Sequence, residues 1–259
     1  MLLSKNIMAS KDILLAWTSR TIRSRYQQSF LGGLWAIIQP AASVAIFSII
    51  FTQIVPVDTG DIPYPVFSYV AVAPWAFFAA SLADMAGSLV QNMTLVTKIY
   101  FPREALPLAA MLARLLDFAI SAAVLVILMI IFRMPFFPLG WLFLPVILFI
   151  QIILVAGLGL IAAAMNVFYR DVQPFLTLII QLWFYASPII YPVSMVPEKL
   201  QAYYFLNPMA GILVSYRGVL LEGSLPNFSL VSAAIISIAI FVFGYWLFKR
   251  VEFLFADIV

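Results

Sequence analysis

Long runs of uncharged, mostly apolar residues alternate with short polar segments along the whole chain. The first run, residues 26–57, has no charged side chain over 32 positions. About 20 apolar helical residues cross the roughly 30 Å hydrocarbon core of a bilayer, and in lipid the backbone amides must bond within their own segment. The pattern therefore predicts membrane-spanning α-helices. We expect six spans, at residues 34–55, 64–90, 107–132, 141–165, 175–191 and 228–248.

The segment 192–227 interrupts this pattern before the last predicted span. It is fairly apolar, but four prolines divide it, and Asn207-Pro208 splits its longest uncharged run. Proline removes a backbone donor and blocks a helix interior. We therefore expect two short re-entrant or interfacial helices here rather than another crossing.

The composition fits this pattern, since 65% of the residues are hydrophobic and only 10% are charged. No soluble core of this size needs so apolar a chain. The sequence predicts an all-α polytopic membrane protein, with residues 1–259 forming a single transmembrane domain.

Basic residues divide unevenly between the two ends of the predicted spans. Ten Lys and Arg fall on the side of the chain termini and three on the opposite side. Because cytoplasmic loops carry the excess, we expect both termini in the cytoplasm and the chain in the cytoplasmic (inner) membrane. The first 32 residues are polar and basic and lack the apolar core of a cleavable signal. The net charge of +3 reflects this bias, so no nucleic-acid partner is expected.

Several kinds of chemistry are absent from the sequence. It contains no Cys and no His, which excludes disulfides, thiolate chemistry and most transition-metal sites. No Gly-Lys dipeptide occurs, so a phosphate-binding P-loop is missing. We expect no cofactor on this chain and no catalytic residue. Asp58 and Asp61 are interpreted as solvated turn residues rather than a catalytic pair.

Three ionisable residues lie inside predicted spans. Asp84 and Arg114 fall at matching depth on consecutive antiparallel spans, and Asp117 lies one turn from Arg114. Intramembrane charges are costly and usually paired. They are interpreted either as a proton relay or polar lining, or as a structural cluster that fastens the second and third spans. We favour the structural cluster, which predicts that Arg114→Ala disrupts folding or assembly.

Two elements on the side of the termini carry more apolar residues than simple connectors need. Residues 10–28 mix apolar and basic positions, as expected of an amphipathic helix at a surface of anionic lipid headgroups, with a merely topogenic basic tail as the alternative. The loop 91–104 is typical of a short helix that docks into a partner protein. Its candidate contact residues are Val96, Lys98, Ile99, Tyr100, Phe101 and Arg103.

Aromatic residues make up 15% of the chain, and interfacial anchoring explains most of them. Some lie within spans, where their faces suit contact with sugar rings, although packing or lipid contact is the simpler interpretation. The candidates for a substrate path are Trp35, Trp75, Phe78, Trp183, Phe184 and Tyr185.

Three segments in register resemble one family. They are RYQQSFLGGLWAIIQP at residues 25–40, NVFYRDV at 166–172 and NPMAGILVSYRGVLL at 207–221. Together they resemble the signatures of ABC-2 type polysaccharide export permeases, in the same order and spacing across essentially the whole chain.

The resemblance implies a six-span permease subunit that forms a homodimer and exports a lipid-linked polymer such as O-antigen, capsule or teichoic acid. It implies a separate cytoplasmic ATPase subunit that binds ATP and Mg, which would explain the missing P-loop. By analogy, 1–32 would hold an interface helix, 91–104 a coupling helix and 192–227 external gate helices. Arg170 and Asp171 would brace the fourth span against the interface helix, with a plain loop turn as the alternative. The gate residues would be Tyr203, Asn207, Pro208, Tyr216 and Arg217.

The sequence is also compatible with other functions. A small-molecule or drug ABC-2 exporter is the nearest alternative. A secondary transporter could use Asp84 and Asp117 as protonation sites. An integral-membrane glycosyltransferase acting on lipid-linked sugars would need a catalytic carboxylate that faces the surface. None of the acidic residues available there makes a convincing pair; they are Asp58, Asp61, Asp171, Glu198 and Glu222.

Overall fold

The computed structural model describes residues 2–27, 32–98 and 101–256, and every regular element in this part of the chain is helical. The prediction of an all-α polytopic membrane protein is confirmed. The α-helices are α1 (Leu2–Gln27), α2 (Trp35–Ile49), α3 (Tyr64–Gln91), α4 (Met93–Lys98), α5 (Ala105–Ile131), α6 (Pro138–Trp141), α7 (Leu144–Phe168), α8 (Val172–Tyr185), α9 (Glu198–Tyr204), α10 (Pro208–Arg217) and α11 (Phe228–Val251). Single π-helical turns extend α2 as η2 (Ile50–Ile54) and α10 as η4 (Gly218–Glu222), and the 3-10 turn η5 (Glu252–Ala256) follows α11.

Among the described residues, five helical segments are long and apolar enough to cross a membrane. They are Gly32–Ile54, Tyr64–Gln91, Ala105–Ile131, Pro138–Phe168 and Phe228–Phe255. The fifth predicted span, residues 175–191, is wrong in its extent. Its helix, α8, has 14 residues and is therefore about 21 Å long. The chain turns at Ala186 because the prolines that follow cannot continue a helix.

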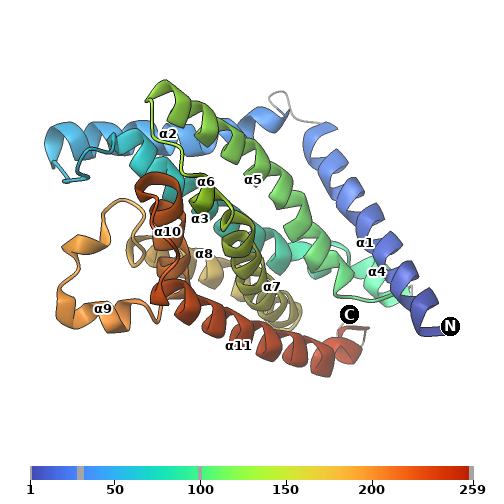
Figure 1. Cartoon of the computed structure of the whole chain (residues 1–259). Helices are drawn as coiled ribbons and strands as arrows, with labels where there is room; N and C mark the ends of the chain where they lie inside the picture. Colours follow the sequence, from blue (N-terminus) through green and yellow to red (C-terminus); the bar gives the residue numbers. More distant parts are fainter. Residues whose placement is uncertain (1, 28–31, 99–100, 257–259) are drawn as a thin grey trace.

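The helices form one bundle with two recognisable ends (Figure 1). One end, which we call the termini end, holds α1, α4, η5 and the turn between α7 and α8. The opposite end, the far end, holds residues 55–63, 132–143 and 186–227. The segment 192–227 contains the two short helices expected of it, α9 and α10.

Helix α3 is the centre of the bundle and contacts α2, α5, α7, α8 and α10. Its side chains are buried on nearly every side, unlike those of α2, α5 and α11. Small residues also let α7 and α11 pack closely against each other. A Cβ added at Gly157 would lie 2.7 Å from the Cα of Phe241 on α11, so glycine is required at this crossing.

A proline inside α2 creates one of the contacts that hold this helix to its neighbour. Pro40 has no amide hydrogen for the carbonyl of Ala36, one helical turn before it. The hydroxyl of Ser121 on α5 donates to that carbonyl at 2.8 Å. A backbone acceptor that the helix cannot satisfy therefore becomes an interhelical bond.

Candidate functional site

A cluster of four charged side chains joins α1, α3 and α5 near the termini end. Arg114 Nε donates to Asp84 Oδ2 at 2.7 Å, and Arg114 Nη1 donates to Asp117 Oδ2 at 3.0 Å. Arg25, in the last turn of α1, donates to the same two carboxylates, at 2.6 Å to Asp84 and 3.0 Å to Asp117. Each carboxylate thus meets both guanidinium groups, and the cluster is neutral as a whole.

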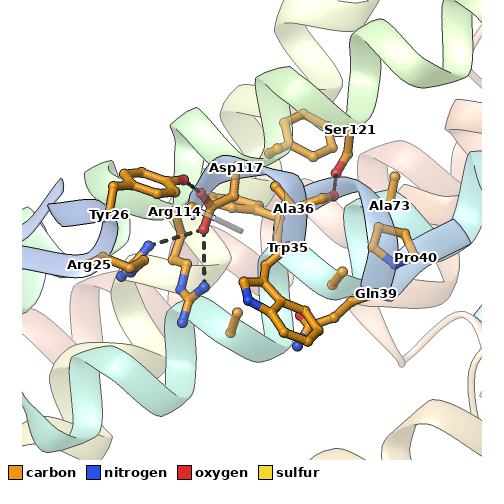
Figure 2. Close-up of a pocket in the computed structure, with 15 residues that line it drawn as sticks. Arg25, Tyr26, Trp35, Ala36, Gln39, Pro40, Ala73, Arg114, Asp117 and Ser121 are labelled. Atoms are coloured by element: carbon orange, nitrogen blue, oxygen red, sulfur yellow. Dashed lines mark hydrogen bonds and ion pairs between the residues drawn. The ribbon is translucent and has the colours of Figure 1, made fainter. Parts of the chain in front are cut away.

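The structure thus brings together the three intramembrane charges singled out in the sequence and adds Arg25 and Tyr26. Tyr26 donates its hydroxyl to Asp117, as Figure 2 shows. Burial, followed by this hydrogen bond, raises the pKa of Tyr26 to about 12, so the phenol stays a donor. The sequence predicts only a basic tail around Arg25, because nothing in local spacing shows that α1 ends beside α5.

Two cavities adjoin the charge cluster. One, of about 110 Å³, is lined by Arg25, Tyr26, Arg114 and Asp117 together with Trp35 and Gln39 of α2 (Figure 2). The other, of about 240 Å³, is lined by Arg25 and Asp84 with polar groups of α1 and the end of α3. The cluster therefore borders both cavities, and it connects α1 to the two spans that carry its acids.

Helices α2 and α8 are the least covered elements beside α3. Only Pro40 and Val44 of α2 are buried, and no residue of α8 is. On α8, four exposed polar side chains recur every four residues and therefore share one face. This polar stripe consists of Gln173, Thr177, Gln181 and Tyr185. A helix with so little cover inside the protomer must meet lipid, a second copy or a substrate.

The six aromatic candidates for a substrate path do not share one environment. Trp35 is about half exposed on α2, and Tyr185 is 67% exposed on α8. Phe184 is partly buried against Trp75, with ring centroids 5.7 Å apart. Trp75 and Phe78 are buried in the core of the protomer, so assigning them to the surface of a path is wrong for this conformation. Their helix, α3, is apolar on all sides, and its sequence does not show which face is covered.

At the far end, Asn207 connects α8 with α10. Its Oδ1 accepts from Trp183 Nε1 at 2.8 Å and from the amide of Met209 at 3.0 Å, which caps α10. Its Nδ2 donates to the Ser187 hydroxyl at 3.0 Å. Pro208 follows at the first position of α10, where its missing amide hydrogen is harmless. Tyr203 on α9 is exposed.

Arg217 is buried in a cage of backbone carbonyls at the same end. Its guanidinium donates to Pro188 O and Ile189 O, each at 2.6 Å, to Tyr191 O at 3.2 Å and to Phe67 O at 3.3 Å. It also lies 3.7 Å from the centroid of the Phe67 ring. No carboxylate among the described residues pairs with it, so these carbonyls and the ring hold α10, the 188–191 turn and α3 together.

Tyr216 is buried next to Arg217 and donates to Gln151 Oε1 of α7 at 3.2 Å. The five gate residues therefore separate into four that fix the far end internally and one, Tyr203, that faces outward.

The segment 91–104 forms the short helix α4, and its side chains point in two directions. Val96 is buried against Leu89, Leu106 and Phe255, so it does not face a partner as the docking prediction required. Lys98 is exposed, together with Thr94 and Thr97. Phe101 is partly buried against the same apolar cluster. Ile99 and Tyr100 lie outside the described residues.

The end of the chain holds this segment in place. Arg103 donates to the carbonyl oxygen of Glu252, and Lys249 bridges Glu104 at 2.9 Å and Glu252 at 3.1 Å. The ring of Phe255 in η5 is fully buried against Phe248. No local sequence pattern predicts this contact, because Arg103 and Glu252 are 149 positions apart in the chain.

The predicted brace between Arg170 and the interface helix is not present. The side chains of Arg170 and Asp171 are exposed and form no ion pair or hydrogen bond with the residues that the structure describes. They occupy the turn between α7 and α8, where solvation satisfies both charges. Arg25, rather than this pair, fastens α1 to the bundle.

Comparison with known proteins gives a consistent family. The model of the ABC-2 type transporter family matches residues 13–221. The chain is 31% identical over 251 residues to the O-antigen export system permease protein RfbA of Klebsiella pneumoniae, covering 96% of this chain and 95% of that protein. It is 28% identical to RfbA of Myxococcus xanthus, covering 87% and 86%. It is 29% identical to the polysialic acid transport protein KpsM of Escherichia coli, covering 79% of each.

Proposed function

The chain belongs to the ABC-2 type transporter family, and from this premise we propose that it is the membrane-spanning subunit of an ATP-driven exporter of lipid-linked polysaccharide, such as an O-antigen. The observation that carries the proposal is the end-to-end similarity to an O-antigen export permease, which covers 96% of the chain. The nearest alternative, a small-molecule exporter of the same family, has no comparable support, because the relatives found are named for O-antigen and polysialic acid.

The energy for transport would come from a separate cytoplasmic ATPase that holds ATP and Mg. The sequence has no P-loop of its own. The exposed face of α4, with Thr94, Thr97 and Lys98, is the surface that would meet this partner. Because α4 packs on η5 and on Leu106 of α5, a push on it would be passed to the spans.

The substrate path would form between two copies of the chain, on the uncovered faces of α2 and α8. Both helices flank α3, and Phe47 of α2 lies against Phe184 of α8 with ring centroids 5.9 Å apart. The polar stripe of α8 supplies hydrogen-bonding groups for sugar hydroxyls, and Trp35 and Tyr185 supply aromatic faces. Trp183 would act from behind this surface, because Asn207 holds its indole.

In the proposed cycle, ATP binding closes the partner ATPases and moves α4. The dimer then separates along α2 and α8, the lipid-linked end is reoriented first, and the polymer follows. The termini end, which carries the basic excess, would face the cytoplasm. The far end would be the exit, with α9 and α10 as its gate.

A proton-coupled carrier is a weaker proposal than the exporter. Such a carrier needs a carboxylate that can gain and lose a proton during transport. Asp84 and Asp117 are each held by both Arg25 and Arg114, so neither is free for this role in the described conformation.

The proposal is tested by co-purifying the tagged chain with candidate ATPases from the same cell and measuring ATP hydrolysis in lipid. We expect a stable complex whose coupled hydrolysis is lost in Lys98→Glu. The matched control is Lys199→Glu, an exposed lysine on α9 at the far end. Cells that lack the chain should accumulate the lipid-linked glycan on the cytoplasmic side. Transport by the chain alone in vesicles that contain no ATPase would contradict the proposal.

A further inference from the structure

An apolar groove lies between α5 and α7, on a side of the bundle that the proposed path does not use. Its volume is about 420 Å³, and α3 and α10 form its floor. The side chains that line it are apolar except for Trp141 and Tyr216, and the Tyr216 hydroxyl already donates to Gln151. Such a surface does not hold ordered water, because water needs several polar partners.

The groove opens on the outside of the bundle. Ala123 of α5 and Pro145 of α7 both line it and are both exposed. Because α5 and α7 belong to membrane-spanning segments, the medium at this opening is lipid hydrocarbon.

The length of the groove matches one leaflet. On α5 it runs from Phe118 to Met129, eleven residues further on, a distance of about 16 Å along a helix. Half of a hydrocarbon core is about 15 Å. Met129 lies two residues before the end of α5, so the groove occupies the half of the span next to the far end. The acyl chain of a lipid in the leaflet at the far end would therefore fill the groove.

A cationic residue, Arg133, lies just past the end of α5, the helix that forms one side of the groove. Arg133 follows Met129 by four residues, is exposed and forms no ion pair within the described chain. A guanidinium at the hydrocarbon boundary binds phosphate well. We propose that this groove is a binding site for one acyl chain of an anionic phospholipid, whose phosphate contacts Arg133.

The test uses the full chain purified in detergent and titrated with phosphatidylglycerol that carries brominated acyl chains. Bromine quenches indole fluorescence on contact, and the contribution of Trp141 is the difference between the wild-type chain and Trp141→Phe. We expect saturable quenching at one lipid per protomer. Ala122→Phe, which fills the groove, should raise the half-saturating concentration about tenfold, the effect of losing contact with roughly two methylene groups.

Two matched variants separate this site from general lipid contact. Ala119→Phe adds the same ring to an exposed position of α5 outside the groove and should leave the titration unchanged. Arg133→Gln should weaken the binding of brominated phosphatidylglycerol but not the binding of brominated phosphatidylcholine. If Ala122→Phe does not fold, Ala123→Phe tests the same space from the exposed mouth.

Quenching that rises without saturation, or that is equal in the groove-filling variant and the wild-type chain, would overturn the proposal. Displacement of the brominated lipid by polyprenyl phosphate at lower concentration than by phosphatidylglycerol would overturn the assignment to a phospholipid.

Discussion

At the scale of single residues, the charge cluster depends on charge balance more than on any one bond. Removing Arg25 leaves two carboxylates with one guanidinium in a partly buried site. Breaking a buried pair on one side costs several kcal/mol, and partial exposure reduces this. We expect Arg25→Ala to lower the free energy of unfolding by about 2 kcal/mol, measured by thermal or denaturant unfolding in detergent.

The control for this prediction is Arg23→Ala, which removes an exposed charge from the same turn of α1 and should change stability by less than about 0.5 kcal/mol. Adding Asp117→Asn to Arg25→Ala restores neutrality and should recover part of the loss. Equal stability of Arg23→Ala and Arg25→Ala would mean that the cluster does not fasten α1.

A second prediction at the residue scale concerns Arg217. Its bonds reach three carbonyls of the 188–191 turn and one of α3. Lysine is a point charge without the planar fork that these bonds require. We expect Arg217→Lys and Arg217→Gln each to cost roughly 2–3 kcal/mol and to make the 186–192 turn sensitive to limited proteolysis. Lys199→Gln, at an exposed position of the far end, should leave the proteolysis pattern unchanged.

At the scale of elements, α8 carries a prediction about substrate movement. If its polar stripe binds sugar hydroxyls, Thr177→Val and Gln181→Leu should each slow polymer export about fivefold, the effect of losing one hydrogen bond of about 1 kcal/mol. ATP hydrolysis by the complex should persist. Leu182→Ile, on an exposed apolar position of the same helix, is the control. A parallel loss of hydrolysis and export would place the defect in coupling and contradict a role in substrate contact.

At the scale of the whole molecule, the uncovered faces of α2 and α8 predict how two copies meet. The sequence contains no native Cys, so any cross-link reports on the residue introduced. We expect Tyr185→Cys to form a disulfide between copies in membranes. Ile235→Cys, exposed on α11, should not. Efficient cross-linking through α11 and none through α8 would show that the copies meet by another face.

The sequence by itself determined five of the membrane-spanning helices and the two short helices of the segment 192–227. Bilayer thickness fixes the length of an apolar run, the backbone must satisfy its own hydrogen bonds in lipid, and prolines end helices locally. Asp84, Arg114 and Asp117 could be matched by depth, because rise per residue is constant along a helix.

Only the tertiary structure decided which side of each helix is covered and which distant segments meet. Helices that are apolar on every face carry no periodic signal of their orientation. The burial of Phe78 on α3 could therefore not be read from spacing. The burial of Val96 on α4 and the exposure of Arg170 in the turn between α7 and α8 depend on which distant segments pack beside them. The contacts of Arg25 with α3 and α5, and of η5 with α4, join residues far apart in the chain, which only the packing of the bundle brings together.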